Sequence, residues 1–407
     1  MDKALEQSVS EILNTFAEGL TALRGGEDGG LRALLAESRE KVTGILESAL
    51  GCSLEKRIGV SRLSDEDWLR SACLILDELS DPIVIRNGYD REFLKLLDLI
   101  WSHSEEELVQ GMRTKLDSLR KQSRTDYHNF VRYFAKYPLW GSFDPAAGDF
   151  TTFQLRAEVL KRHSYDFLWL YQRLGDYLSK RTLTAILLNW AVLDFSYPVT
   201  VKSIFPDYWE PDIFPDNTGD VLVDVGAYNG DSVLQYVRMY GTGYNKIYAY
   251  EISADSFQLL RQNLTNAGLH DVVLRRKGAG KTREQMYVGS SESDASANQL
   301  RASGAASELV EVVPLDEDLE DTPTFIKMDI EGAEQNALLG LARTIRDHHP
   351  KLAIRDHHPK LAICVYHGYE DLWKIPAMID RMNPDYHFFL RHNGGNLIPT
   401  EFVLLCR

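Results

Sequence analysis

Two acidic residues, Asp224 and Glu251, each close a short hydrophobic run, and two glycines follow the first of them. In the segment VLVDVGAYNGDS (221–232), Gly226 and Gly230 frame a turn between that run and a helical stretch. Glycine suits such a turn because the backbone can approach a ligand closely and adopt a positive φ. Backbone amides at the start of the following helix favour a polar or charged group. The turn is therefore a candidate ligand-binding loop, and its alternative is a tight turn that binds nothing.

Glu251 lies at the end of the run KIYAYE (246–251), about one strand–helix unit beyond the glycine turn. An acid at this position can accept hydrogen bonds from both ribose hydroxyls of a nucleoside. The turn reads DVGAYNGD rather than GxGxxG, so it lacks the glycine spacing that seats a pyrophosphate on the helix. The two segments together favour an adenosyl group without phosphates, and therefore S-adenosylmethionine rather than a nicotinamide dinucleotide.

Two further runs deliver polar side chains to strand ends. TFIKMDIEGAE (324–334) places Asp329 and Glu331 after an apolar run, and CVYHGYEDLW (364–373) places His367 after the next. Ligands of open α/β sheets bind at such carboxyl ends. Histidine is the side chain best suited to accept a proton near neutral pH, although a purely structural histidine is the alternative.

The elements that must position these residues follow a regular order after residue 220. Short β-rich runs alternate with helical stretches, which follow the first, second, fourth and fifth runs, and this alternation predicts a parallel sheet covered on both faces. The last two runs have little room for a helix between them, so we expect a hairpin with one antiparallel strand. The predicted strands are 221–226, 246–251, 271–276, 324–329, 361–367, 386–391 and 401–406.

The first half of the chain is predicted to be mainly helical, because apolar residues recur there every three or four positions. We therefore expect a helical N-terminal region at 1–200 and an α/β domain at 201–407. The connecting segment 194–219 is rich in proline and aromatic residues, which indicates a rigid, packed connection. Tryptophans of the helical half could form an aromatic substrate wall, but ordinary core packing is favoured. They are Trp68, Trp101, Trp140, Trp169 and Trp190. The predicted helices are 2–23, 31–50, 64–80, 90–101, 104–121, 125–137, 153–162 and 165–194.

A nonapeptide, RDHHPKLAI, occurs twice in succession, at 346–354 and 355–363. The unit is too short for a solenoid repeat. Only the second copy runs directly into CVYH, so we place the strand there and expect the first copy to be absorbed as loop or helix end. The duplication accounts for the four histidines without a metal-binding role. They are His348, His349, His357 and His358.

Composition excludes several classes of function. The 407 residues have a formal net charge of -15 and a pI near 5.2, which argues against a nucleic-acid partner. No run of about 18 apolar residues predicts a membrane span, and the N-terminal residues do not resemble a secretory signal. The four cysteines are scattered and form no CxxC pair, so we expect reduced thiols and a cytoplasmic protein.

Taken together, these segments resemble the FkbM-type methyltransferases, a branch of the class I Rossmann-like methyltransferases. The similarity covers about residue 205 to the C-terminus, whereas residues 1–165 match nothing. It implies a doubly wound sheet of seven strands, mostly parallel with one antiparallel, and S-adenosylmethionine as cofactor. The duplicated nonapeptide departs from the family pattern, which has one copy there. The matching segments are VDVGAYNGD, YAYEISADSFQLLRQNL, FIKMDIEGAEQNALLG, PKLAICVYHGYEDLWKIP, FFLRHN and TEFVLLC.

The resemblance also implies roles for individual residues. Glu251 would hold the ribose, Gly278 and Ala279 would flank the adenine, and the glycine turn would line the methionine end. Asp329 and Glu331 would face the sulfonium methyl group together with His367. The complete set implied for the cofactor is Asp224, Gly226, Ala227, Gly230, Glu251, Ile252, Gly278, Ala279 and Asp329.

The expected reaction is in-line displacement of the methyl group by a substrate hydroxyl, which requires alignment and removal of one proton. We hypothesise that His367 is the general base and that Asp329 or Glu331 orients it or the acceptor. The two carboxylates could instead hold a divalent cation, but a hard ion needs more oxygens than these, so no metal ligand is assigned.

The family mostly methylates hydroxyls of sugars, glycans and secondary metabolites, so a small-molecule or glycan acceptor is expected. The N-terminal helices could cover the acceptor pocket, form a homodimer contact, or only pack. Two other classes of protein stay open: a binding protein that retains the fold without turnover, and a nicotinamide-dependent oxidoreductase, which the missing GxGxxG disfavours.

Overall fold

The computed structural model describes residues 3–24, 31–289, 299–301, 308–347, 358–395 and 397–407. The chain divides into two compact units. The first unit comprises residues 1–131, 141–173 and 183–194, and the second comprises 132–140, 174–182 and 195–407. The main division therefore falls at 194–195, close to the expected 200. Two short segments of the helical half belong to the second unit, which the sequence did not indicate.

The first unit is helical, as the apolar spacing predicts. Side-chain caps mark several helix starts: Ser64, Asn87 and Ser104 each accept a hydrogen bond from a first-turn amide. The described helices of the N-terminal half are α1 Lys3–Arg24, α2 Leu31–Leu50, α3 Leu54–Ile58, α4 Asp65–Ser80, α5 Gly88–Ser102, α6 Glu105–Gln122, α7 Arg124–Lys136, α8 Thr151–Arg162, α9 Ser164–Arg173 and α10 Tyr177–Val192.

The predicted helix over 165–194 is two helices, α9 and α10. The amide of Gly175 donates to the carbonyl oxygen of Phe388, 2.8 Å away, instead of continuing the helical ladder. A Cβ on Gly175 would lie 2.9 Å from the Phe389 ring, so this close approach requires glycine. Helical periodicity does not reveal such a break, because the cause lies in a strand more than 200 residues away.

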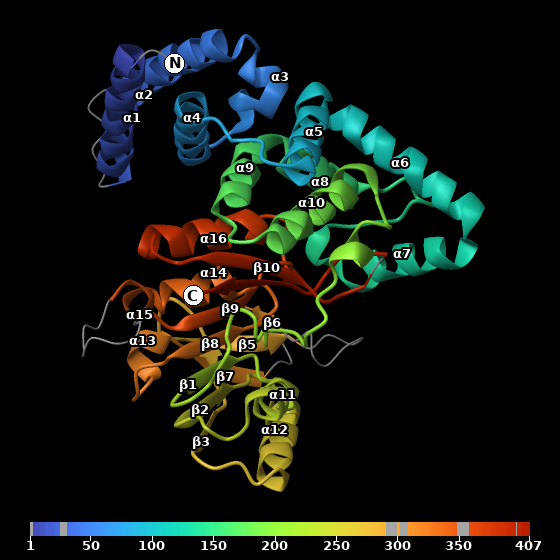
Figure 1. Ribbon diagram of the computed structural model, residues 1–407, viewed down its shortest axis with the longest axis vertical. Helices are drawn as coiled ribbons and strands as arrows, with labels where there is room; N and C mark the ends of the chain where they lie inside the picture. Colours follow the sequence, from blue (N-terminus) through green and yellow to red (C-terminus); the bar gives the residue numbers. More distant parts are fainter. Residues whose placement is uncertain (1–2, 25–30, 290–298, 302–307, 348–357, 396) are drawn as a thin grey trace. The chain divides into compact units, whose positions relative to one another are not determined.

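The second unit is built on a seven-stranded sheet with the order β10-β11-β9-β8-β1-β2-β3. Strand β11 is antiparallel to both neighbours and the other pairs are parallel, which confirms the predicted sheet and its hairpin. Figure 1 shows β1, β2 and β3 side by side, as their pairing requires. The strands are β1 Val221–Val225, β2 Lys246–Tyr250, β3 Val272–Arg275, β8 Phe325–Met328, β9 Lys360–Cys364, β10 Phe388–His392 and β11 Phe402–Cys406.

Helices follow four of these strands, in the places where the sequence predicts them. Figure 1 draws α11 and α12 on the opposite side of the strands from α13 and α15, so the sheet is doubly wound. Strand order reverses between β1 and β8, and ligands of such sheets bind at this point. The helices are α11 Asp231–Tyr240, α12 Ala254–Asn266, α13 Leu315–Asp318, α14 Glu334–Leu339, α15 Ala342–Arg346 and α16 Asp371–Met382.

The connection 195–220 packs into the domain core, as its aromatic content indicates. Trp209 is fully buried and its ring lies 5.1 Å from that of Tyr236 and 5.3 Å from that of Phe325, in edge-to-face contacts. Phe214 joins the same cluster. The segment therefore fixes the residues around it, including its neighbour Tyr208.

A second, four-stranded sheet with the order β4-β7-β5-β6 was not predicted. Two of its strands, β4 (Gly278–Ala279) and β6, have only two and three residues, too few to show an alternating pattern. The sheet matters because β4 and β6 bring residues to the cavity described below. The other strands are β5 Glu284–Gly289, β6 Gln299–Arg301 and β7 Glu308–Val313.

The duplicated nonapeptide lies between α15 and β9. Strand β9 starts at Lys360, which confirms that the second copy supplies the strand, and α15 ends at Arg346 in the first. Residues 348–357, with His348, His349 and His357, lie outside the described residues. His358 is described, and its Nδ1 is 2.8 Å from the side-chain amide of Asn383.

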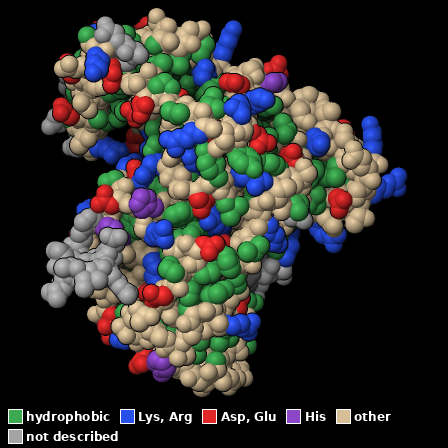
Figure 2. All heavy atoms as spheres, in the orientation of Figure 1, with side chains coloured by type: hydrophobic (Ala, Val, Ile, Leu, Met, Phe, Trp, Pro, Cys, Tyr) green, Lys and Arg blue, Asp and Glu red, His purple; other side chains and the backbone are tan. Residues whose placement is uncertain are grey.

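The surface shown in Figure 2 carries side chains of both charges, and two of the four cysteines are buried. On the face shown in Figure 2, Lys and Arg side chains are interspersed with acidic and hydrophobic ones. None of the described helices has the length and apolar character needed to cross a bilayer. None of the four cysteines forms a disulfide bond, and Cys364 in β9 and Cys406 in β11 are buried.

Candidate active site

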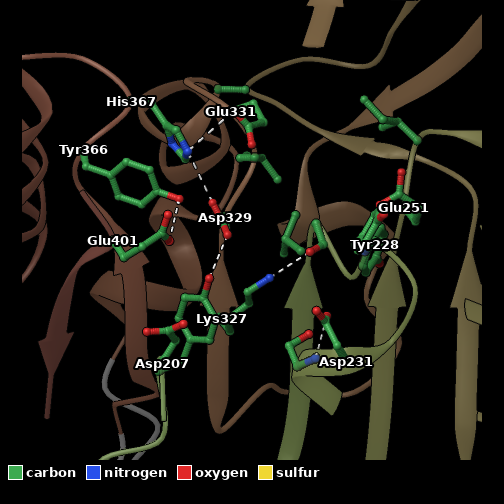
Figure 3. Close-up of a pocket in the computed structure, with 18 of the residues that line it drawn as sticks. Asp207, Tyr228, Asp231, Glu251, Lys327, Asp329, Glu331, Tyr366, His367 and Glu401 are labelled. Carbon is green, nitrogen blue, oxygen red and sulfur yellow. Dashed lines mark hydrogen bonds and ion pairs between the residues drawn. The ribbon is translucent and has the colours of Figure 1, made fainter. Parts of the chain in front are cut away.

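A cavity of about 760 Å³ lies at the carboxyl ends of the central strands, where an open α/β sheet binds ligands. All of its lining residues belong to the second unit. Figure 3 shows two groups of side chains in it: Glu251 and Tyr228 at one end, and Asp329, His367 and Glu401 at the other. We call these the cofactor end and the acceptor end.

At the cofactor end, the glycines are required by contacts within the protein. Gly226 has φ +81°, and a Cβ there would lie 1.9 Å from the carbonyl oxygen of Asp329. Gly230 has φ +89°, and a Cβ there would lie 2.9 Å from Leu264. The turn is thus tightly seated against β8 and α12. The sequence had predicted glycine for approach to a ligand, whereas the structure shows approach to neighbouring protein atoms.

Glu251 binds the glycine loop directly. Its two carboxylate oxygens accept hydrogen bonds from the amides of Tyr228, 2.9 Å away, and Ser253, 2.7 Å away. The amides of Gly226 and Ala227 donate to the carbonyl oxygen of the residue before Glu251. Burial raises the pKa of Glu251 above its usual value, and its hydrogen bonds only partly oppose this. A carboxylate oxygen has room for a second donor, so Glu251 can still accept from a ligand in the cavity.

Three residues predicted to bind the cofactor, Asp224, Ala227 and Gly230, do not line the cavity. Asp224 is fully buried beneath the loop, where it accepts a hydrogen bond from Ser232 and pairs with Lys327 at 3.0 Å. These residues therefore shape the loop and do not face the cavity.

Lys327 is a site residue that the sequence reasoning missed. It is buried in the middle of β8, and its Nζ donates to the carbonyl oxygen of Gly226, 2.7 Å away, besides pairing with Asp224. Although burial opposes the charge, the nearby carboxylates of Asp224 and Asp329 raise its pKa. The sequence could have indicated this residue, because a lysine inside the apolar run FIKM is expected to be buried and a buried charge requires a partner.

Residues predicted for the adenine end do line the cavity. Ile252 follows β2, and Gly278 and Ala279 form β4. Leu300 of β6 joins them, and its Cδ1 would be 3.1 Å from a Cβ on Gly278. The four residues form a mainly apolar slot, which suits a flat heterocycle.

At the acceptor end, His367 is enclosed by carboxylates. Its Nδ1 is 2.9 Å from Glu334, and its Nε2 is 3.4 Å from Asp329 and 3.8 Å from Glu331. Burial lowers the pKa of His367, but the three carboxylates outweigh burial and raise it to about 10. The imidazole ring is therefore protonated in neutral solution. It must lose this proton before it can act as the predicted general base.

Asp329 is held by three groups. Its Oδ2 accepts a hydrogen bond from the Tyr208 hydroxyl, 2.7 Å away, and its charge is compensated by Lys327 and His367. These interactions outweigh burial and lower the pKa of Asp329, so it is ionised. One ligand atom each of Asp329, Glu331 and His367 lies within 4.8 Å of the others, a grouping that could hold a cation. The His367 imidazolium already pairs with these carboxylates and offsets part of their charge, so we interpret the three residues as an ion-pair network.

The acceptor end also contains aromatic and acidic residues that the sequence reasoning missed or placed elsewhere. Trp140 was expected to pack in a core, but it lines the cavity, and so do Tyr133 and Tyr137 of the same segment. Further lining residues are Asp207, Tyr208, Tyr366, Thr400 and Glu401.

Several of these residues adopt strained backbone conformations. Among the described residues other than glycine, six have a positive φ, and four of the six line this cavity. Such conformations cost free energy and accumulate at functional sites. The four are Tyr208, Tyr228, Glu331 and Glu401.

The seven-stranded sheet, with its antiparallel β11 and its cavity at the strand reversal, is a fold shared with a methyltransferase of known structure. Residues 224–390 match the family model of the methyltransferase FkbM domain. The chain is 27% identical in sequence to methyltransferase FkbM from Methylobacillus flagellatus, whose crystal structure it matches with a TM-score of 0.51. That alignment covers 62% of this chain and 62% of the other. Residues 224–390 therefore form a domain of the FkbM methyltransferase family.

More distant structures share less. A putative rRNA methylase from Clostridium thermocellum is 14% identical over 47% of this chain and 87% of its own, with a TM-score of 0.30. A putative methyltransferase from Streptococcus mutans is 13% identical over 47% of this chain and 89% of its own, with a TM-score of 0.29. These likenesses are too weak to bear on function. No curated protein matches the chain.

Proposed function

We propose that this chain is an S-adenosylmethionine-dependent O-methyltransferase acting on a hydroxyl of a sugar, glycan or secondary metabolite. The strongest support for this proposal is that the cofactor end and the acceptor end belong to one cavity. The glycine loop and Glu251 are in hydrogen-bond contact at one end, and Asp329 lies at the other, directly against Gly226.

The residues present fit an adenosyl cofactor. Glu251 would accept from the ribose, and the slot of Ile252, Gly278 and Ala279 would hold the adenine. Gly226 lets the loop lie directly against Asp329 at the end of β8, where a side chain would collide with the protein. When bound, S-adenosylmethionine supplies the activated methyl group.

The protein's own chemistry is alignment of the acceptor and removal of one proton. Glu334 orients His367, because it accepts hydrogen bonds from the amides of Ile330 and Gly332 and is itself fixed. His367 can act as the base only after it loses its resting proton. A positive charge brought beside Asp329 opposes that proton and is expected to lower the pKa of His367 toward neutrality.

Calorimetric titration with S-adenosylhomocysteine and with NAD tests the cofactor. We expect S-adenosylhomocysteine to bind and NAD not to bind, and Glu251→Ala to weaken the binding by about 10- to 100-fold through the loss of charged hydrogen bonds. The matched control is Glu320→Ala, an exposed glutamate outside the cavity lining. Binding of NAD instead, or equal affinity in Glu251→Ala, contradicts the proposal.

Turnover needs its own test, because a binding protein with this fold would pass the titration. Release of S-adenosylhomocysteine is measured with a panel of hydroxyl-bearing sugars, glycans and metabolites. Turnover with one of them supports the O-methyltransferase proposal. Cofactor binding without turnover across the panel favours the binding protein.

A further inference from the structure

The acceptor end has a wall that comes from the helical half of the sequence. Residues Arg132–Trp140 belong to the second unit, although about 80 residues separate them from β1. The Trp140 ring is 7% exposed, and its Nε1 donates to the carbonyl oxygen of Tyr366, 2.8 Å away. Tyr133 stacks on it with ring centroids 5.6 Å apart and an interplanar angle of 22°. These rings form a fixed aromatic surface facing the cavity.

Two carboxyl groups share this end of the cavity, those of Asp207 and Glu401. Figure 3 shows Glu401 beside Tyr366 and Asp207 further along the same side of the cavity, both away from Glu251. Glu401 accepts a hydrogen bond from the Tyr366 hydroxyl, 3.0 Å away. Within the described part of the chain, neither carboxyl forms an ion pair. Their hydrogen-bond partners are neutral groups, Tyr366 and, for Asp207, Asn393.

Two buried cations near this end already have carboxylate partners, and the charge of Lys202 only partly offsets that of Asp207. Lys327 pairs with Asp224, and His367 pairs with Glu334 at 2.9 Å and Asp329 at 3.4 Å. Because the negative charge is not fully compensated, burial together with Asp329 raises the pKa of Glu401 to about 7. Burial likewise raises the pKa of Asp207. Both pKa shifts have the direction expected for buried carboxyl groups whose negative charge is only partly compensated.

The two carboxyl groups and the aromatic rings favour a ligand group that is positively charged. Buried carboxylates are stabilised by a cationic partner, and ring faces attract ammonium groups. An anionic group would be repelled by Asp207 and Glu401, although Arg238, exposed on α11 and also in the lining, could attract one. The rings and both carboxyls together favour the cation.

We propose that the surface formed by Tyr133, Trp140, Asp207, Tyr366 and Glu401 is an ammonium-binding subsite, so that the molecule methylated on its hydroxyl also carries a protonated amine. We call it the ammonium subsite. Its identification with the acceptor position rests on the proposed function, but its preference for a cation rests on the side chains alone.

Three probes that share a phenyl ring and carry a positive, a neutral or a negative substituent test the subsite: benzylammonium, benzyl alcohol and benzoate. Each places the same ring on the aromatic surface. Calorimetry on the full chain at pH 7.5 is expected to give benzylammonium a Kd about tenfold lower than either other probe. Equal affinities, or tighter binding of benzoate, overturn the inference.

Isosteric variants locate the effect. Glu401→Gln and Asp207→Asn are each expected to reduce the preference for benzylammonium to less than about threefold. Asp212→Asn removes the same charge from an exposed position of the neighbouring segment outside the lining, and it should keep the full preference. A preference unchanged in both cavity variants would overturn the assignment, and if they fail to fold, the ranking of the three probes on the wild type decides.

Titration with S-adenosylhomocysteine on the same preparations separates this inference from the proposed function. Cofactor binding without a preference for benzylammonium overturns the ammonium subsite alone. A preference for benzylammonium without cofactor binding overturns the proposed function and leaves the subsite.

Discussion

The two ends of the cavity are built in different ways. The cofactor end comes from consecutive strand ends: Glu251 follows β2, and its carboxylate contacts the loop that follows β1. The acceptor end is assembled from segments far apart in the sequence, among them Trp140, Tyr366 and Glu401. The first end is fixed by backbone hydrogen bonds, whereas the second depends on side-chain contacts. This difference suggests that changes at the cofactor end act on binding, and changes at the acceptor end act on turnover and specificity.

The largest effect is expected from His367→Gln. Loss of a general base lowers turnover by about 10²- to 10⁴-fold, and kcat should fall accordingly while the affinity for S-adenosylhomocysteine changes little. Both are measured on one preparation, kcat from product release and Kd from calorimetry. Unchanged kcat would remove His367 from the reaction.

Gly226→Ala tests the cofactor end, where we expect a loss of binding affinity rather than a loss of turnover. The new Cβ would lie 1.9 Å from the carbonyl oxygen of Asp329, so the loop must move, and we expect affinity for S-adenosylhomocysteine to fall by about 100-fold. Gly241→Ala is the matched control, because Gly241 also has a positive φ but no atom within 4 Å of its Cβ position. If the two variants bind equally well, the tight seating of the loop does not matter.

A smaller effect is expected on the pH profile. The neutral imidazole of His367 is the active form and its pKa is raised to about 10, so kcat/KM should rise with pH through the neutral and alkaline range. Glu334→Gln removes a carboxylate that raises this pKa, so the rising limb should move to lower pH. Glu370→Gln, an exposed change nearby, should leave the limb in place. If the rising limb stays in place in Glu334→Gln, the assignment of this limb to deprotonation of His367 is contradicted.

The smallest effect is expected from chelation. Because His367 already pairs with Asp329 and Glu331, we expect EDTA to leave initial rates within about twofold of the untreated rate. Rates are compared before and after dialysis against the chelator. Loss of activity that added Mg²⁺ restores would show that these three residues hold a metal ion.

The sequence predicted those parts of the molecule that depend on local patterns. The seven strands, their hairpin and the position of Glu251 follow from hydrophobic runs and their order. Glycine identified the loop after β1, although Gly226 is required by Asp329 and not by a ligand.

Residues that reach the cavity through tertiary packing could not be predicted. Trp140 reads as an ordinary residue of the helical half, and only the fold brings it to Tyr366. Glu401 is the first residue of a predicted strand and belongs to the segment TEFVLLC, but that pattern does not indicate its contact with Tyr366. Lys327 is the exception, because a charge inside an apolar strand could have been recognised as a buried ion pair.

The most direct test is a crystal structure of the chain with S-adenosylhomocysteine. We predict that the ribose hydroxyls lie within hydrogen-bond distance of the Glu251 carboxylate and that the sulfur faces Asp329 and His367. A ligand bound with its ribose away from Glu251, or outside this cavity, would contradict the proposed function.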